Sequence, residues 1–355
     1  MKILEENEVG QKRFLTLNEM ISYNKTQPKT KYLWNGIKEK SFGLVFGPSK
    51  SGKTIFCENL AMSIAMGKKE FFGYQLDGIP KKVLFVGLEE FFQNRVERNV
   101  MQFESLIDSE QLLIGENYRF QPIDFTRRIV KNVDYENLIN TIQDSKAEVV
   151  FIDSITRMNL GQLENSADAE KLMQRLRDVC DSLKITLICI HHTPKIGDDA
   201  ITMDKIKGSA VFAQESDFAI GINCTSKKNR YIKNVFFRYA QDDDDNVKEF
   251  VIDNDCWLNY IDDANEDEII ARTDRRRTNN KSDVIADYLN ENSSITFSKQ
   301  ELFEKLSSVL GVKKRQYGYY LQDLEKKNKI KTPVLGYYAS VNYGDVKNEG
   351  DADRK

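Results

Sequence analysis

Short runs of apolar residues alternate with longer amphipathic stretches through most of the chain. The runs are FGLVF (42–46), KVLFVGL (82–88), AEVVFID (147–153) and TLICIHH (186–192). Between them apolar residues recur at helical spacing, most clearly after residue 53, from residue 94 and over 167–183. Buried strands that alternate with helices are typical of a parallel sheet with helices on both faces. The sequence therefore predicts an α/β fold with a mostly parallel sheet.

Three further apolar runs extend this sheet toward residue 260. They are DFAIGINC (217–224), RYIKNVFFRYA (230–240) and KEFVIDN (248–254), and an acidic turn joins the last two. The core domain is thus expected over residues 41–260, behind an N-terminal lead-in over 1–40. Residues 261–281 change from acidic to basic with few apolar positions, which predicts a linker.

The C-terminal part has the pattern of a small separate domain. Helix patterns in SDVIADYLNE, SKQELFEKLSSVL and KKRQYGYYLQDLEKKN precede a β-like stretch, IKTPVLGYYASVN. Three helices followed by short strands predict a winged helix-turn-helix over 282–343. The polar tail, 344–355, is expected to be disordered.

The segment GPSKSGKT at 47–54 matches the phosphate-loop pattern G-x-x-x-x-G-K-[ST], between a strand and a helix. Its backbone N–H groups can wrap a phosphate at the helix N-terminus. Lys53 can reach the β- and γ-phosphate oxygens, and the Thr54 hydroxyl can bind Mg²⁺. The segment predicts an ATP and Mg²⁺ site. The expected nucleotide contacts are Gly47, Pro48, Ser49, Lys50, Ser51, Gly52, Lys53, Thr54 and Ile55.

Acidic residues end two of the predicted strands. Asp153 could hold Mg²⁺ through its water shell, and Glu89 or Glu90 could activate an attacking water. Acids at strand ends are also common as helix caps or as solvated loop residues. The residues alone leave both interpretations open.

The ordered series of motifs resembles the RecA-like ATPases, most closely the hexameric plasmid-replication helicases of the RepA type. The resemblance covers about residues 32–252. It is carried by WNGIKEKSFGLVFGPSKSGKT, FFGYQLDGIPKKVLFVGLEE, EVVFIDSITRM, ICIHHTPK and KGSAVFAQESDFAIGI. It implies a RecA-like P-loop NTPase core, Asp153 in the Walker B position, and Glu89 as catalytic base with Glu90 as the substitute. It also implies a sensor of the γ-phosphate at His191 and His192.

The same resemblance implies contacts outside the phosphate loop. Residues 193–207 correspond to a mobile loop that lines the central pore in ring-forming relatives, with Lys205 and Lys207 as DNA contacts. A Lys-x-Arg pair that reaches a neighbouring subunit's nucleotide corresponds here to Phe236 and Arg238, so only the arginine is retained. Arg230 is a second candidate. A trans-acting arginine implies an oligomer, with a homo-hexameric ring as the expected form.

Simpler interpretations of these segments remain open at this point. Residues 193–207 could be a solvated surface loop, since acidic residues dilute their positive charge. The two histidines could cap the strand or bind a metal. We reject zinc because no acid or cysteine lies near them in the sequence.

Charge is distributed unevenly along the chain. The 355 residues carry 52 Lys and Arg against 55 Asp and Glu, a net charge of −3, which argues against a uniformly basic nucleic-acid surface. Residues 272–331 are nevertheless locally basic. A recognition helix here would contact duplex DNA. The expected contacts are Lys313, Lys314, Arg315, Gln316 and Tyr319. Winged helices also serve as protein-docking modules, which is the alternative.

Five cysteines without a C-x-x-C pair are expected to be reduced thiols. No membrane segment is expected, because no apolar run is long enough, and the start of the chain lacks a signal-peptide pattern; both favour a cytoplasmic protein. The leading hypothesis is a DNA-directed ATPase that acts on single strands in a ring pore, on duplex DNA, or on both, in replication of a plasmid or mobile element. The alternative is a nucleotide-gated DNA-binding regulator or loader with slow turnover. A small-molecule kinase is disfavoured, because no lid pattern is present.

Overall fold

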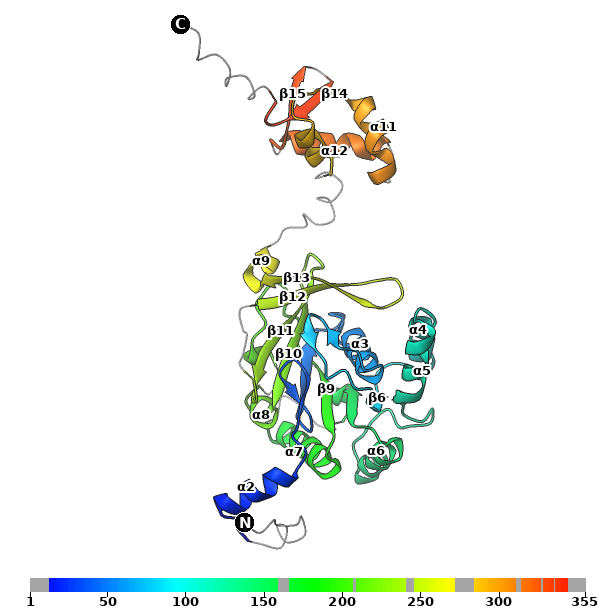
Figure 1. Cartoon of the computed structure of the whole chain (residues 1–355), viewed down its shortest axis with the longest axis vertical. Coiled ribbons are helices and arrows are strands. Elements are labelled where there is room, and N and C mark those ends of the chain that lie inside the picture. The colour runs from blue at the N-terminus through cyan, green and yellow to red at the C-terminus, as the bar shows by residue number, and fades with distance from the viewer. Residues whose placement is uncertain are drawn as a thin grey trace. The chain divides into compact units, whose positions relative to one another are not determined.

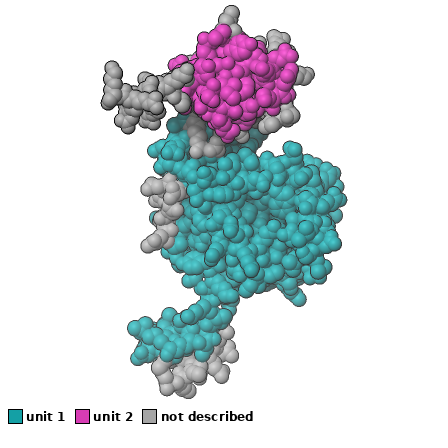
Figure 2. All heavy atoms as spheres, turned by 45° about the horizontal axis from the view of Figure 1, so that its top comes forward, with its two compact units in different colours: residues 1–271 teal, residues 272–355 magenta. Residues whose placement is uncertain are grey.

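The computed structural model describes residues 13–158, 166–206, 209–240, 246–271, 284–310, 314–326, 328–334 and 336–343. The chain divides into two compact units, Met1–Ala271 and Arg272–Lys355, coloured separately in Figure 2. Each unit is described by itself below. Within the described ranges, no helix has the length and apolar character needed to cross a membrane.

The elements of the first unit alternate as the sequence predicts (Figure 1). Its strands are β1 (Tyr32–Trp34), β2 (Ile37–Lys38), β3 (Phe42–Gly47), β4 (Glu70–Phe71), β5 (Tyr74–Gln75), β6 (Val83–Gly87), β7 (Tyr118–Phe120), β8 (Val149–Asp153), β9 (Thr186–His192), β10 (Phe218–Cys224), β11 (Arg230–Phe237), β12 (Asn246–Ile252) and β13 (Leu258–Asn265). Its helices are α2 (Leu17–Thr26), α3 (Lys53–Ala65), α4 (Phe92–Glu104), α5 (Asp108–Asn117), α6 (Asn132–Ser145), α7 (Ser166–Leu183), α8 (Ser209–Glu215) and α9 (Glu266–Ala271), with short 3-10 turns η1 (Ile155–Arg157) and η2 (Met203–Lys205).

One large sheet forms the centre of this unit. In the described part of the chain it has nine strands, in the order β13-β12-β11-β10-β3-β9-β8-β6-β7. The strands from β10 to β7 are parallel to one another, whereas β11, β12 and β13 follow β10 as an antiparallel extension. The predicted mostly parallel sheet is confirmed.

Both faces of the sheet are buried, and the strands alternate between them. On β8, Val150 and Ile152 join the hydrophobic cluster under α6 and α7, while Val149 and Phe151 join the cluster under α3. The other central strands follow the same period of two. Odd and even positions therefore determine which residues at a strand end can reach the α3 side.

Two predicted boundaries differ from the structure. The linker does not begin at residue 261, because β13 and α9 continue the first unit to Ala271. Glu266 of α9 binds Lys233 of β11 at 2.6 Å, which ties this segment to the sheet. At the other end, Leu33, Trp34 and Ile37 lie in the buried core, so part of the predicted lead-in belongs to the domain. The sequence analysis missed both because these elements are short and mostly polar.

The second unit has its own hydrophobic core. It is helical at 284–291 and contains β14 (Phe297–Ser298), α11 (Lys299–Leu310), α12 (Lys314–Lys326), β15 (Ile330–Val334) and β16 (Tyr337–Ser340). Among its described residues, three strands pair in the order β14-β16-β15. The core is built from Ile285, Leu289, Leu302, Tyr317 and Leu321, with smaller neighbours.

Candidate nucleotide site

The phosphate loop connects β3 to α3 at the carboxyl edge of the parallel strands, where α/β sheets bind ligands. Gly52 has φ +106° at the N-terminus of α3, a backbone conformation that favours glycine. A Cβ on Gly47 would lie 2.0 Å from the carbonyl oxygen of Ile222 on β10. Of the other loop residues, Ser49 and Lys50 are exposed, whereas Pro48 and Ser51 are buried. Thr54 and Ile55 lie in the first turn of α3, and both are partly buried.

Lys53 is the buried cation of this loop. Its side chain is only 3% exposed, and its ammonium donates a hydrogen bond of 2.7 Å to the carbonyl oxygen of Pro48. Burial lowers the pKa of Lys53 to about 8, although the negative charges of Asp153 and Glu89 oppose this effect. The N-terminus of α3 and a desolvated ammonium both favour an anion at this position.

Thr54 and Asp153 meet beside the loop. The Thr54 hydroxyl donates to Oδ2 of Asp153 at 2.6 Å. Burial raises the pKa of Asp153, which is 4% exposed, and the Thr54 hydrogen bond acts in the opposite direction. The other oxygen, Oδ1, is buried and has no hydrogen-bond partner within the described structure. An unsatisfied carboxylate oxygen next to a threonine hydroxyl fits a hard divalent cation such as Mg²⁺.

Glu89 receives three hydrogen bonds from neighbouring strands. Ser154 and Thr156 donate to Oε1, the latter at 2.7 Å. Nε2 of His192 lies 2.9 Å from Oε2. Burial tends to raise the pKa of Glu89, but the hydrogen bonds from His192, Ser154 and Thr156 outweigh it and lower the pKa to about 2. The carboxylate is therefore ionised at neutral pH.

The alternation of the strands explains which strand-end residues meet. Glu89, Asp153 and His192 fall on the α3 side, and their ligand atoms all lie within 4.8 Å of one another. His191 points to the other face, where it is 1% exposed and its ring stacks on Phe212 at 4.7 Å between centroids. The structure thus brings only one of the two predicted sensor histidines into the site. His191 cannot contact a nucleotide there.

The two acids beside His192 also correct the argument against a metal. No acid lies near the histidines in the sequence, but β6 and β8 bring Glu89 and Asp153 next to His192 in space. The site can hold a divalent cation on carboxylate oxygens, and the magnesium prediction uses Asp153 for this purpose.

Glu90, the substitute base, is engaged elsewhere. Both of its carboxylate oxygens accept hydrogen bonds from Arg98 of α4, at 2.8 and 2.6 Å. Its neighbour Glu89 faces the phosphate loop instead. The geometry therefore favours Glu89 for work on a bound nucleotide.

Arg238 lies at the opposite edge of the sheet from the phosphate loop. β11 runs antiparallel to β10, so Arg238 follows the end of β11 near the start of β3, and its guanidinium donates to the carbonyl oxygen of Gln214 at 2.8 Å. Phe236 is partly buried against the core. Arg230, at the other end of β11, pairs with Cys224 on the phosphate-loop edge. Within one chain, the structure thus places Arg230 on the nucleotide side and Arg238 away from it.

The loop after β9 is anchored to the core rather than free. Ile196, Ile201 and Ile206 are buried in it, and Lys205 pairs with Asp199 at 3.0 Å. Lys207 lies outside the described residues. In the second unit, Lys313 also lies outside them, as do the side chains of Lys314, Arg315, Gln316 and Tyr319.

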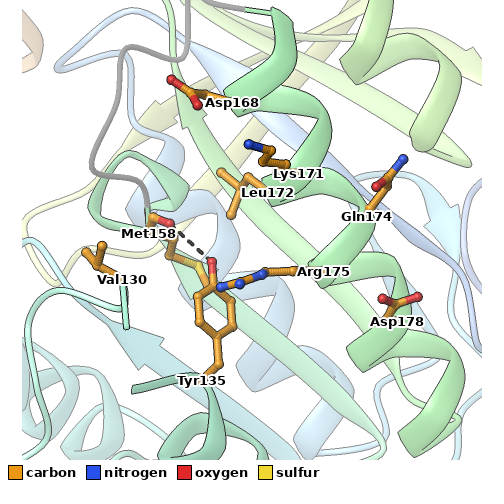
Figure 3. A pocket seen from close by; sticks show the side chains of 9 residues that line it. All are labelled: Val130, Tyr135, Met158, Asp168, Lys171, Leu172, Gln174, Arg175 and Asp178. Carbon is orange, nitrogen blue, oxygen red and sulfur yellow. Dashed lines mark hydrogen bonds between the residues drawn. The ribbon is translucent and has the colours of Figure 1, made fainter. Parts of the chain in front are cut away.

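A separate pocket of about 330 Å³ lies between α6 and α7 (Figure 3). Tyr135 donates to the carbonyl oxygen of Met158 at 3.1 Å, and the Arg175 guanidinium lies 4.8 Å from the centre of the Tyr135 ring. The charged side chains of its lining are of both signs: Asp168, Lys171, Arg175 and Asp178. It has no excess of positive charge for a triphosphate, so the phosphate loop remains the candidate nucleotide site.

Comparison with known proteins supports this assignment. A family model described as an AAA domain matches residues 11–198, more than half of the 355-residue chain. The chain belongs to this family. The matched part of the AAA domain contains the phosphate loop, Glu89, Asp153 and His192. With the sheet, it confirms the predicted P-loop ATPase core of RecA-like α/β fold and gives the chain a nucleotide-hydrolysing role.

A search of curated proteins gives no match. Among solved structures, the AAA-domain chain is similar to a KaiC-like protein of the hyperthermophilic archaeon Pyrococcus horikoshii. That match has 17% identity and a TM-score of 0.44, and it covers 63% of this chain and 90% of the other. The chain is also similar to the ATPase domain of a helicase, with 11% identity and a TM-score of 0.48, covering 63% of this chain and 85% of that domain.

Proposed function

We propose that the protein is a Mg²⁺-dependent, DNA-directed ATPase of the RepA type that acts as an oligomer in replication of a plasmid or mobile element. One observation carries the hydrolytic part of this proposal. A buried lysine, a hydroxyl and two strand-end acids, Lys53, Thr54, Asp153 and Glu89, converge on the carboxyl edge of one sheet. This combination provides a cation for the phosphates, a metal ligand and a base.

In the proposed reaction, Glu89 accepts a proton from a water whose oxygen attacks the γ-phosphorus. The bond from that phosphorus to the β,γ-bridging oxygen breaks, and ADP and phosphate leave. Lys53 stabilises charge on the phosphate oxygens. When bound, Mg²⁺ would be held by the Thr54 hydroxyl and, through water, by Asp153, and it would neutralise phosphate charge. His192, hydrogen-bonded to Glu89, is placed to sense the loss of the γ-phosphate.

The second unit supports the DNA-directed part of the proposal. Three helical segments, a three-stranded sheet and a separate core are the parts of a winged helix-turn-helix. The start of α12 and the segment before it are rich in Lys and Arg, as in a recognition helix that binds phosphates. We propose this unit as the duplex-binding module. In the same proposal, Lys205 and Lys207 contact single-stranded DNA.

Self-association has support from an unpartnered helix. α2 begins with a capping box between Thr16 and Glu19 and exposes an apolar stripe: Phe14, Leu17, Met20 and Ile21. Figure 1 shows it next to the N-terminus, away from α4 and α5. These two helices expose apolar residues beside a pocket of about 200 Å³, namely Val100, Phe103, Ile107 and Leu112.

Charge complements this apolar match. The rim of the α4–α5 surface is acidic through Glu97, Glu104 and Asp108, whereas the end of α2 and the segment after it are basic through Lys25 and Lys29. We propose that α2 of one chain docks on α4 and α5 of the next, building a homo-hexameric ring. Size-exclusion chromatography with light scattering tests this. A monomeric Leu17→Ser/Met20→Ser variant supports the interface, and an unchanged oligomer excludes it.

The alternative, a nucleotide-gated DNA regulator or loader with slow turnover, is favoured by one observation. In the nucleotide-free arrangement three hydrogen bonds hold Glu89, and Arg238 lies away from the nucleotide edge. Such a site could bind ATP without rapid hydrolysis.

ATP hydrolysis with and without DNA separates the two functions. We expect single-stranded DNA to stimulate the translocating enzyme, whereas binding restricted to a duplex site supports the regulator. Lys53→Ala should abolish hydrolysis and weaken ATP binding. Glu89→Gln should retain binding and lose hydrolysis by about 10²- to 10⁴-fold, the range of general-base effects. A wild-type protein that does not bind Mg-ATP would exclude both.

A further inference from the structure

A buried ionic network links the phosphate-loop helix to the tip of β6. At its centre is Glu58, on α3 five residues after Lys53, whose side chain is fully buried. Nε and Nη2 of Arg98 donate to its two carboxylate oxygens at 2.8 and 2.7 Å. Nε of Arg95 adds a third hydrogen bond at 3.1 Å. A buried carboxylate is thereby neutralised from α4.

Arg98 makes a second fork in the opposite direction. Its Nη1 and Nη2 bind the two oxygens of Glu90 at 2.8 and 2.6 Å. One guanidinium therefore bridges a carboxylate on α3 and a carboxylate next to Glu89. Only arginine has the planar set of donors for two such forks, since the lysine ammonium is a single point charge.

Close packing fixes the same network against the strand. The Arg95 guanidinium lies 4.3 Å from the centre of the Phe85 ring. A Cβ built on Gly87 would lie 1.8 Å from Nη1 of Arg95, so the arginine occupies space that only glycine leaves open. The two arginines and two glutamates are also balanced in charge, which makes their burial tolerable. The network therefore holds Gly87 to Glu90 at a fixed distance from α3.

We infer that Arg98 is a positioning residue for hydrolysis, which sets the backbone of Glu89 by holding Glu90 to the phosphate-loop helix through Glu58. This inference rests on the proposed role of Glu89 as base. Lys53 at the start of α3 and Glu89 at the tip of β6 act on the same phosphate, so their separation controls the geometry of attack. A displacement of about 1 Å can reduce a rate by roughly 100-fold.

The test compares Arg98→Lys, Glu90→Gln and the double variant with Arg128→Lys, an exposed arginine that serves as matched control. For each full-length protein, kcat is measured at saturating Mg-ATP, and the Kd is measured for a non-hydrolysable ATP analogue. We expect Arg98→Lys to lower kcat by about 10- to 100-fold. The Kd should stay within about 2-fold, because the phosphate loop is untouched. The double variant should be no slower than the slower single variant, since both changes break one link.

Three results would overturn the inference: an unchanged kcat in Arg98→Lys, a loss confined to the Kd, or effects of the two single variants that multiply. If Arg98→Lys fails to fold, Glu90→Gln decides, because its carboxylate is 30% exposed and can be replaced without burying a new charge. A wild-type protein that binds but never hydrolyses ATP overturns the proposed base as well. An active wild type with unaffected variants overturns only the positioning role.

Discussion

Replacing Lys53 by methionine should stabilise the nucleotide-free protein, although it removes the residue most important for binding phosphate. Lys53 is 3% exposed, and its contact in the phosphate loop is a neutral carbonyl oxygen, that of Pro48. Burial of its charge is what lowers its pKa, despite the nearby carboxylates. Methionine has a similar length and no charge to desolvate, so it should fit the same space at lower free energy.

The magnitude follows from the pKa. A decrease from 10.5 to about 8 corresponds to about 3 kcal/mol of destabilisation by the charged form. Loss of the hydrogen bond to Pro48 offsets about 1 kcal/mol, which leaves a net gain of about 2 kcal/mol. Below pH 8 both the folded and the unfolded wild type are protonated at Lys53, so the full gain is present. Between pH 8 and 10.5 the folded wild type loses its proton first and recovers stability, so the gain disappears.

Tryptophan fluorescence can follow this unit alone, because both tryptophans of the chain, Trp34 and Trp257, lie in it. We expect the melting temperature of Lys53→Met at pH 7 to be about 4–8 °C above wild type, using the usual shift per kcal/mol for a unit of this size. Saturating Mg-ATP should raise the wild-type melting temperature but not that of the variant. Lys50→Met, at an exposed loop position, is the control and should change little. A variant that melts at or below wild type, or a gain that persists above pH 10.5, would refute the reasoning.

Other predictions concern the strand tips. Thr156→Val removes one donor to Glu89 and should destabilise the protein by about 1 kcal/mol at pH 7, measured by urea unfolding. Because the folded pKa of Glu89 is depressed, this deficit should shrink as the pH falls from 4.5 toward 2, and a deficit independent of pH would contradict it. Gly87→Ala should displace Arg95 and destabilise the unit by about 1–3 kcal/mol, with Gly115→Ala as a control at an open position; equal stabilities would show that Arg95 yields freely.

Much of the ATPase core was predictable because its determinants are local. The phosphate loop, the alternation of strands and helices and the acids at strand ends are each visible within about ten residues. A stricter use of the two-residue period would also have separated the histidines. His192 has the parity of Ile188 and Ile190, which face α3, whereas His191 has that of Leu187 and Cys189, which face α7.

Contacts between distant segments were not predictable in the same way. The partners of Glu89 are 65 to 103 residues away, and Glu58 meets Arg98 across 40 residues. Arg238 was misplaced for a related reason. A motif identifies a residue on a strand, but the direction of that strand in the sheet decides at which edge it lies, and β11 runs opposite to its parallel neighbours.

The contacts of the nucleotide-free site indicate how nucleotide could control it. Lys53 is bound to Pro48, Thr54 to Asp153, and Glu89 to three donors. Each group that would act on a triphosphate is thus already satisfied inside the protein, so binding must exchange these contacts rather than add new ones. The exchange at Glu89 is the most demanding, because a carboxylate with a pKa of about 2 is a weak base. Any partner that draws His192 away from Glu89 would strengthen the base, and His192 immediately precedes the loop proposed to contact DNA. In this chain, contact with DNA could therefore control hydrolysis through a single hydrogen bond.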